Sequence, residues 1–196
     1  MKLFLKHVSP KLALLAVFFL FLEGCASSHM TVIPDDNKVT KPSSDTALVY
    51  FARPSSFGGA IQATVYDDDV YIGTISANTN IAYKAKPGPH MFMVVSESAD
   101  FMQAELLAGK TYYAEVIARP GVWKARFSFR PNNGQIPDSE VQNNLQNTKQ
   151  VEPNAEGLKW ASENAPSITE KKKANLPKWQ AKPEGDKQIL SAQSGK

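Results

Sequence analysis

Cys25 is the residue of this chain with the clearest potential for covalent chemistry. It is the only cysteine in the sequence, so its thiol has no partner within the chain for a disulfide or a cysteine-rich metal site. It directly follows an apolar run over residues 12–22 and the pair Glu23-Gly24, and three lysines precede that run. The thiol therefore lies at the end of a basic and then apolar segment of the kind that directs export.

The apolar run is too short to cross a membrane. It contains 11 residues, whereas a helix needs about 20 residues to span the hydrocarbon core of a bilayer. Its length suits the apolar part of a secretory signal, and Gly24 is the small residue expected before a cut. We therefore expect residues 1–24 to be a signal peptide. An ordinary signal peptide or an uncleaved anchor stays open as the alternative, because Glu23 is unusual beside a cleavage site.

The sequence Leu22-Glu23-Gly24-Cys25 resembles the lipobox of bacterial lipoproteins. In that family the cysteine thiol receives a diacylglyceryl group, a peptidase cuts before the cysteine, and the new amino group is acylated. Acyl chains of this kind hold a protein on a membrane without a spanning helix. The residue after the cysteine, Ala26, is not the aspartate that favours the inner membrane. The resemblance therefore implies a lipid-anchored protein on the periplasm-facing leaflet of the cell outer membrane.

Charge and motifs narrow the function classes. Removal of residues 1–24 takes away three lysines and one glutamate, so the formal net charge falls from +3 to +1. Such a small charge gives no single-sign field for nucleic acid, and we expect no nucleic-acid partner. The sequence has no GxSxG, HExxH, P-loop or dinucleotide fingerprint. We therefore expect neither a cofactor nor an enzyme, and binding or structural roles gain weight.

Composition divides the remaining chain into three parts. Residues 25–45 are small, polar and proline-containing, which predicts a lipidated cysteine followed by a flexible tether. Residues 46–131 are rich in β-branched and aromatic residues, and residues 132–196 are polar. The last part has helix-start signals at Asp138, Asn154 and Ser167, with stops at Pro166 and Pro177. It also carries Trp160 and Trp179, so we expect this partly helical extension to dock in part on the preceding domain.

Residues 46–131 predict a mainly β domain. Short β-branched and aromatic runs are separated by Gly, Pro, Asn and Asp, and the aspartates of residues 67–69 mark a tight hairpin turn. Residues 123–130 alternate apolar and polar side chains, which indicates one buried and one wet face. We expect an antiparallel β-sandwich of about seven to eight strands, with a small barrel as the alternative.

The β domain also resembles a family of bacterial lipoproteins known only as a domain of unknown function. The resemblance covers residues 46–131 and has four parts. These are residues 47–51 followed by Arg53-Pro54, the hairpin over 65–73, Lys86-Pro87-Gly88, and residues 107–113. In that family these motifs lie on a compact β-sandwich similar to carbohydrate-binding and peptidase-associated modules. The family has no established catalytic site, so the resemblance implies fold and location but no catalytic residue.

Two places in the β domain are candidate binding sites. Arg53 could bind a carboxylate or phosphate through two hydrogen bonds, although pairing with an acidic residue of the fold is the alternative. Tyr112 and Tyr113 are adjacent, so in a regular strand one of them faces outward, and we expect a weak binding face there. The tyrosines and Trp123 could instead form a sugar-binding platform or fill the core.

Other polar groups are better explained by the fold. Three adjacent aspartates at residues 67–69 cannot all point at one calcium ion, so a solvated turn is expected and no metal site. His90 is the only histidine inside the β domain, and we expect a hydrogen-bonded turn residue. The lysines of residues 171–173 could contact lipid head groups, but a solvated helix face is expected.

The sequence thus favours a membrane-anchored periplasmic lipoprotein that acts as a non-catalytic binding or adaptor module of the cell envelope. Its partners would be the membrane, through the lipid on Cys25, and an envelope protein. A small-ligand or glycan-binding module is one alternative, and an aromatic-lined pocket would favour it. A hydrolase with an unrecognised site is the other, and it requires Arg53 or His90 to converge with carboxylates and a hydroxyl.

Overall fold

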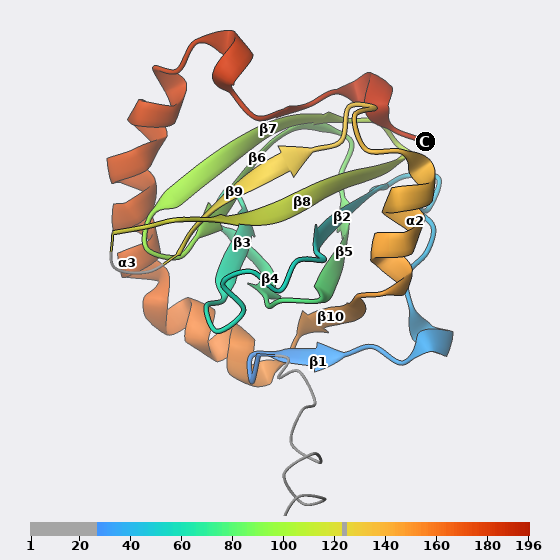
Figure 1. Cartoon of the computed structure of the whole chain (residues 1–196), viewed down its shortest axis with the longest axis horizontal. Coiled ribbons are helices and arrows are strands. Elements are labelled where there is room, and N and C mark those ends of the chain that lie inside the picture. The colour runs from blue at the N-terminus through green and yellow to red at the C-terminus, as the bar shows by residue number, and fades with distance from the viewer. Residues whose placement is uncertain (1–26, 123–124) are drawn as a thin grey trace, which may run out of the picture.

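The computed structural model describes residues 27–122 and 125–196, and this part of the chain is mainly β (Figure 1). It forms eleven strands: β1 (Met30–Val32), β2 (Ala47–Arg53), β3 (Ala63–Asp67), β4 (Val70–Ile75), β5 (Thr79–Ala85), β6 (Gly88–Val95), β7 (Ala99–Leu106), β8 (Thr111–Arg119), β9 (Arg126–Pro131), β10 (Lys149–Pro153) and β11 (Ile189–Leu190). Its α-helices are α2 (Asp138–Gln146) and α3 (Ala155–Gln180), and its short 3₁₀ helices are η2 (Asp35–Asn37), η3 (Glu184–Asp186) and η4 (Ala192–Ser194).

The strands form two sheets that pack on one another. The order is β1-β10-β5-β2-β8-β9 in the six-stranded sheet and β11-β7-β6-β3-β4 in the five-stranded sheet. Apolar side chains of both sheets meet in one core cluster, in which the rings of Phe51 on β2 and Phe92 on β6 lie edge to face with centroids 5.0 Å apart. This burial is the main stabilising term of the fold, at about 25 cal/mol per Å² of apolar surface.

A helix covers the outer face of each sheet. On the six-stranded sheet, Val141 and Leu145 of α2 pack on a second cluster that contains Tyr50 and Tyr113. On the five-stranded sheet, α3 packs on a third cluster. Figure 1 shows α2 and α3 on opposite sides of the sheets. Both faces of β2 are therefore buried along its whole length, which explains its continuous apolar sequence.

The structure corrects two parts of the predicted β arrangement. Eight strands, β2 to β9, lie within residues 46–131, but β1, β10 and β11 raise the described total to eleven. The sheets are also mixed and not purely antiparallel, because β2–β8, β5–β10 and β7–β11 pair in parallel. Local turn signals predict only hairpins, whereas each of these parallel pairs joins strands that are distant in sequence.

The range predicted as a flexible tether is partly folded. Residues 30–32 form β1, which pairs antiparallel with β10 in the register Met30↔Pro153 to Val32↔Val151. Met30 is buried, and its side chain packs in the core cluster between the sheets. The tether prediction is therefore wrong for this stretch, because an edge strand needs only three residues when a neighbouring strand supplies its partners.

The C-terminal extension docks as expected, but its helices differ from the prediction. Asn154 is the N-cap of α3, and its side chain accepts a hydrogen bond from Gly157 N at 2.9 Å. The helix then continues through Pro166 and Pro177, so the predicted stop and the separate helix starting at Ser167 are both wrong. An interior proline costs about 3 kcal/mol. Packing of one apolar stripe of α3 on the sheet offsets that cost, because helix stability in proteins comes mainly from such contacts.

Candidate functional site

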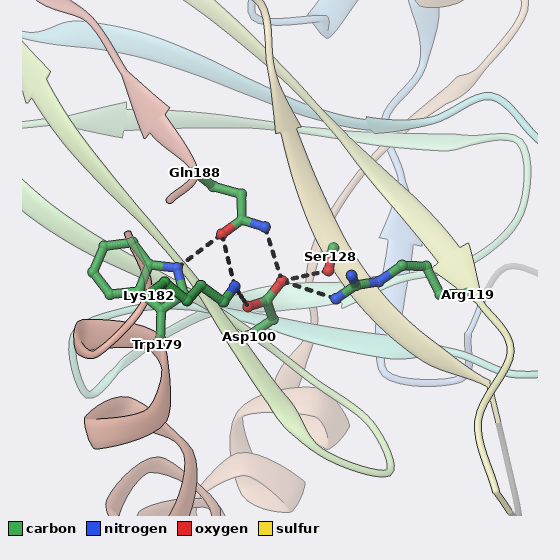
Figure 2. Close-up of polar contacts among 6 residues, drawn as sticks. All are labelled: Asp100, Arg119, Ser128, Trp179, Lys182 and Gln188. Carbon is green, nitrogen blue, oxygen red and sulfur yellow. Dashed lines mark hydrogen bonds and ion pairs between the residues drawn. The ribbon is translucent and has the colours of Figure 1, made fainter. Parts of the chain in front are cut away.

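A cluster of polar side chains lies where the two sheets and the C-terminal extension meet (Figure 2). Asp100 on β7 is buried, and its carboxylate accepts hydrogen bonds from Ser128 Oγ on β9 and from Arg119 at 3.2 Å. Lys182, just after α3, donates to the other carboxylate oxygen at 3.3 Å, and Gln188 donates at 3.4 Å. One carboxylate thus joins both sheets to the segment between α3 and β11.

A second layer of hydrogen bonds extends this cluster to the end of α3. Trp179 Nε1 donates to Gln188 Oε1 at 2.8 Å, and Lys182 Nζ donates to the same oxygen at 3.3 Å (Figure 2). Trp179 is 3% exposed and packs against Phe101 of β7. Nothing in the sequence pattern predicted this cluster, because Asp100 and Gln188 are 88 residues apart.

This cluster contains a serine, a lysine and a carboxylate, but its geometry is structural. Ser128 is 2% exposed, which keeps a substrate from its hydroxyl. Its proton already points at Asp100, and Lys182 also binds that carboxylate. Nucleophilic catalysis needs a base beside an accessible nucleophile. The arrangement therefore holds segments together and is not built to attack a substrate.

His90 lies in a second cluster at the end of the β3–β4 hairpin. Its Nδ1 is 2.8 Å from Asp67 Oδ2, and its Nε2 is 2.7 Å from the carbonyl oxygen of Lys86. Tyr83 donates to the same carboxylate at 3.0 Å, and burial together with that charge raises the pKa of Tyr83. Because Nε2 faces a carbonyl, it carries a proton and is not free to act as a base. His90 is thus a hydrogen-bonded structural residue.

The three aspartates of the hairpin turn have separate roles. Asp67 is buried against His90, Asp68 has a positive φ of 51°, and Asp69 is 2.8 Å from Lys172 Nζ on α3. The hairpin itself was predicted correctly, whereas a wholly solvated turn was not, because Asp67 points inward. Across residues 27–122 and 125–196, no group of three or more His, Cys, Asp or Glu side chains is placed to hold a metal ion.

Arg53 does not have the partner that either interpretation of the sequence expected. Its side chain is buried, and the guanidinium donates to backbone carbonyls of the following loop: Ile61 at 2.7 Å, Gly58 at 2.8 Å and Phe57 at 3.1 Å. It also lies over the ring of Phe127, 4.7 Å from its centroid. Burial lowers the pKa of the guanidinium. Arg53 therefore fixes a loop, and a ligand cannot reach it.

The prediction that Tyr112 or Tyr113 is exposed and forms a binding face is also wrong. Both side chains are buried, because Tyr112 lies in the core cluster between the sheets and Tyr113 lies in the outer cluster under α2. The Tyr112 hydroxyl donates to the carbonyl of Ala192 in η4 at 3.2 Å. The Tyr113 hydroxyl donates to Glu115 and accepts from Asn144 of α2. The alternation was correct, but the sequence did not show which segments cover the outer faces.

A groove of about 250 Å³ lies between α3 and the five-stranded sheet. At one end, the ring of His29 stacks on Trp160 with centroids 5.1 Å apart. The remaining wall is mostly polar and comes from the ends of β3, β4 and β6 and from one face of α3. Its lining residues are His29, Gln62, Thr64, Thr74, Val95, Ser96, Trp160, Asn164, Ser167, Ile168 and Lys171. Neither His29 nor this groove was predicted as a site.

The first described residues are fastened to the start of α3. The side chain of Asn154 donates to the carbonyl of Ser28 at 2.8 Å, and its backbone N–H donates to the carbonyl of His29 at 3.2 Å. Gly157 lies so close to His29 that a Cβ at this position would be 2.2 Å from the His29 carbonyl oxygen. A glycine is required here by close approach and not by backbone conformation. We call residues 27–32 together with the first turn of α3 the junction.

Cys25 and Trp123 lie outside the described residues, so the structure gives no contacts for the predicted lipid site or for that tryptophan. None of the helices over residues 27–122 and 125–196 is both long and apolar enough to cross a bilayer.

Comparison with known proteins yields a distant similarity. No protein-family profile and no solved structure matches the chain. An uncharacterized protein of Haemophilus influenzae is 25% identical over 124 residues, which cover 61% of this chain and 73% of that protein. This similarity agrees with a set of related proteins of unknown function and carries no information on lipid attachment.

Proposed function

We propose that this protein is a lipid-anchored, periplasm-facing lipoprotein of the outer membrane that acts as a non-catalytic binding or adaptor module. We class its two stacked sheets as a β-sandwich, flanked by α2 and α3. The anchor would be the acylated Cys25, and its sequence setting supports this assignment. A fold alone does not assign a function, which depends on the chemically reactive groups and their contacts.

The observation that supports the proposal is that the buried charged side chains are all bonded to other groups of the protein. Arg53, Asp67, Asp100 and Glu115 are the buried charged residues of the described chain, and each binds other groups of the protein. Active sites instead keep such groups accessible to a substrate and short of partners. The hydrolase alternative needed His90 or Arg53 to converge with carboxylates and a hydroxyl in a cleft. Arg53 is bound to three backbone carbonyls. His90 does lie beside the Asp67 carboxylate, to which the Tyr83 hydroxyl donates, but its other nitrogen is bound to the Lys86 carbonyl, so we do not favour this alternative.

Exposed apolar side chains support a protein partner. Phe57 is 63% exposed and Val122 is 70% exposed. They belong to neighbouring loops, since a Cβ at Gly58 would be 3.5 Å from the Cβ of Ala118 and 3.7 Å from that of Ala125. Phe57 lies in a loop that Arg53 fixes through three backbone carbonyls, and aromatic side chains are enriched at protein interfaces. Val122 adds exposed apolar surface from the neighbouring loop. We assign these two loops to the contact with an envelope protein.

In-cell photo-crosslinking tests this assignment. A photoreactive amino acid replaces Phe57 or Val122 in the full-length protein, and Leu107, which is 47% exposed in the β7–β8 turn, is the control position. The same positions are tested in a Cys25→Ser form that cannot be acylated. A discrete adduct from the loop positions of the acylated form only is expected. Equal adducts from all positions, or none, would remove the adaptor assignment.

The groove under α3 favours a second candidate, a small-ligand or glycan-binding module. The stacked pair of His29 and Trp160 offers an aromatic surface beside hydroxyl and amide groups, which is the combination that sugars bind. NMR titration of the soluble domain with a panel of neutral oligosaccharides tests it. Shifts confined to groove residues and lost in Trp160→Ala would support this candidate, and an unshifted spectrum would contradict it.

A further inference from the structure

The folded part of the chain begins almost directly after the proposed lipid site. Only Ala26 separates Cys25 from Ser27, and Ser27 is already buried. The backbone N–H of Met30 donates to the carbonyl of Ser27 at 3.0 Å, so the turn that leads into β1 is fixed at that residue. A long flexible tether between lipid and domain is therefore absent from this part of the sequence.

The short spacing limits how far Ser27 can lie from the membrane. A residue spans at most about 3.6 Å of extended chain, so the Cα of Ser27 lies within about 7 Å of the Cα of Cys25. The polar head-group layer on each side of a bilayer is itself about 5–7.5 Å thick, given a ~30 Å core and a total of 40–45 Å. A cysteine whose acyl chains are in the hydrocarbon core therefore places Ser27 at the head groups.

The junction is the face that this distance brings to the membrane. Besides the buried contacts of its first residues, it presents two exposed apolar side chains, Leu158 at 57% and Val32 at 40%. Its exposed charge is Glu156 in the first turn of α3, and the exposed Lys159 follows directly after that turn. In Figure 1, β1 and the start of α3 lie at one end of the molecule and the C terminus lies at the other.

We propose that the junction of the acylated protein rests on the head groups of its own membrane and gives the domain one fixed orientation. This inference deepens the proposed function and depends on acylation of Cys25. The anchor supplies the attachment, and Leu158 and Val32 enter the interfacial layer as apolar side chains do. Because the junction has no excess of lysine and arginine, the contact does not depend on anionic lipids. The end that carries Leu107 and the C terminus points away from the bilayer.

Fluorescence quenching on vesicles tests the orientation. The acylated protein is purified with a single added cysteine, Leu158→Cys on the junction or Leu107→Cys at the opposite end. Because a diacylglyceryl group occupies the native Cys25 thiol, a fluorophore attaches only to the added cysteine. Each protein is placed in phosphatidylcholine vesicles that contain lipids spin-labelled at the head group. The label at position 158 is expected to be quenched severalfold more than the label at position 107, with no change when anionic lipid is added.

A linker insertion supplies the matched control. Twelve Gly and Ser residues between Ala26 and Ser27 leave the residue after the cysteine unchanged and add about 19 Å of average reach. This insertion is expected to abolish the difference between the two labels. Equal quenching without the linker, in protein whose acylation mass spectrometry confirms, overturns the orientation and leaves the lipoprotein assignment intact. A mass without the acyl groups overturns the proposed function itself and this inference with it.

Discussion

Replacing Gly157 by alanine should destabilise the protein, although alanine normally stabilises a helix. Alanine is a better helix former than glycine by about 1 kcal/mol. At this position, however, the added Cβ would lie 2.2 Å from the carbonyl oxygen of His29. That oxygen belongs to the backbone and accepts a hydrogen bond from Asn154, so it cannot rotate aside. The only relief is to move residues 27–32 away from α3.

The expected cost follows from the contacts that this movement breaks. Two hydrogen bonds from Asn154 are lost, at about 1 kcal/mol each. Loss of the His29–Trp160 ring pair costs about 1 kcal/mol more, and partial exposure of Met30 costs up to about 2 kcal/mol. After subtraction of the gain in helix propensity, the free energy of unfolding should fall by about 2–4 kcal/mol.

Urea unfolding of a soluble form that starts at Cys25→Ser measures this change. Hydrogen exchange at the Ile33 amide, which donates to Gln150 of β10, reports whether the loss is located in β1. Gly185→Ala is the control, because a Cβ there meets no atom within 4 Å. If Gly157→Ala were as stable as its parent, residues 27–32 could not be held against α3 as the structure shows, and the junction would not form a fixed surface.

Three further changes test the remaining clusters. Asp100→Asn leaves Lys182 without its carboxylate, so the free energy of unfolding should fall by about 1–3 kcal/mol. Limited proteolysis between α3 and β11 should also accelerate, and unchanged proteolysis would contradict the role of the cluster. Arg53→Lys cannot bind three carbonyls at once and should lower stability by about 2 kcal/mol, with faster cleavage near Phe57. Burial raises the pKa of Tyr66 to about 12, above its ordinary value of about 10. The neutral phenol therefore contributes its full stabilisation below about pH 10, and this contribution is lost as the pH rises toward 12. In urea unfolding at increasing pH, Tyr66→Phe should remove that part of the alkaline loss, and an unchanged profile would refute this cause.

Local signals in the sequence predicted the parts of the fold that depend on neighbouring residues. The β3–β4 hairpin was predicted because its turn needs one residue in the left-handed region, and Asp68 supplies it. The N-cap at Asn154 was predicted for the same reason, since a cap involves only the next three residues. The alternation around Phe127 and Phe129 also placed both side chains correctly in the core.

The features that were missed depend on residues far apart in the chain. Tyr112 and Tyr113 were expected to offer one exposed ring. Tyr112 faces the core, and α2 covers the outward-facing Tyr113, but no sequence period shows where that helix docks. Asp69 and Lys172 form a contact that was not predicted. Asp69 was expected in a solvated turn and Lys172 on a solvated helix face. Opposite charge was the only signal available for that pair, and charge alone does not select partners.

Residues 189–196 contact both sheets late in the chain, and this has a consequence for folding. β11 adds an edge to β7, and Lys196 exchanges two backbone hydrogen bonds with Thr111 at 2.8 and 3.0 Å. A chain made from its N-terminus leaves the β7 edge unpaired and the Tyr112 hydroxyl without its Ala192 acceptor until these residues are present. Contacts of such long sequence separation slow folding. Proteolytic loss of residues 189–196 would therefore reopen an unpaired strand edge, which is a template for aggregation.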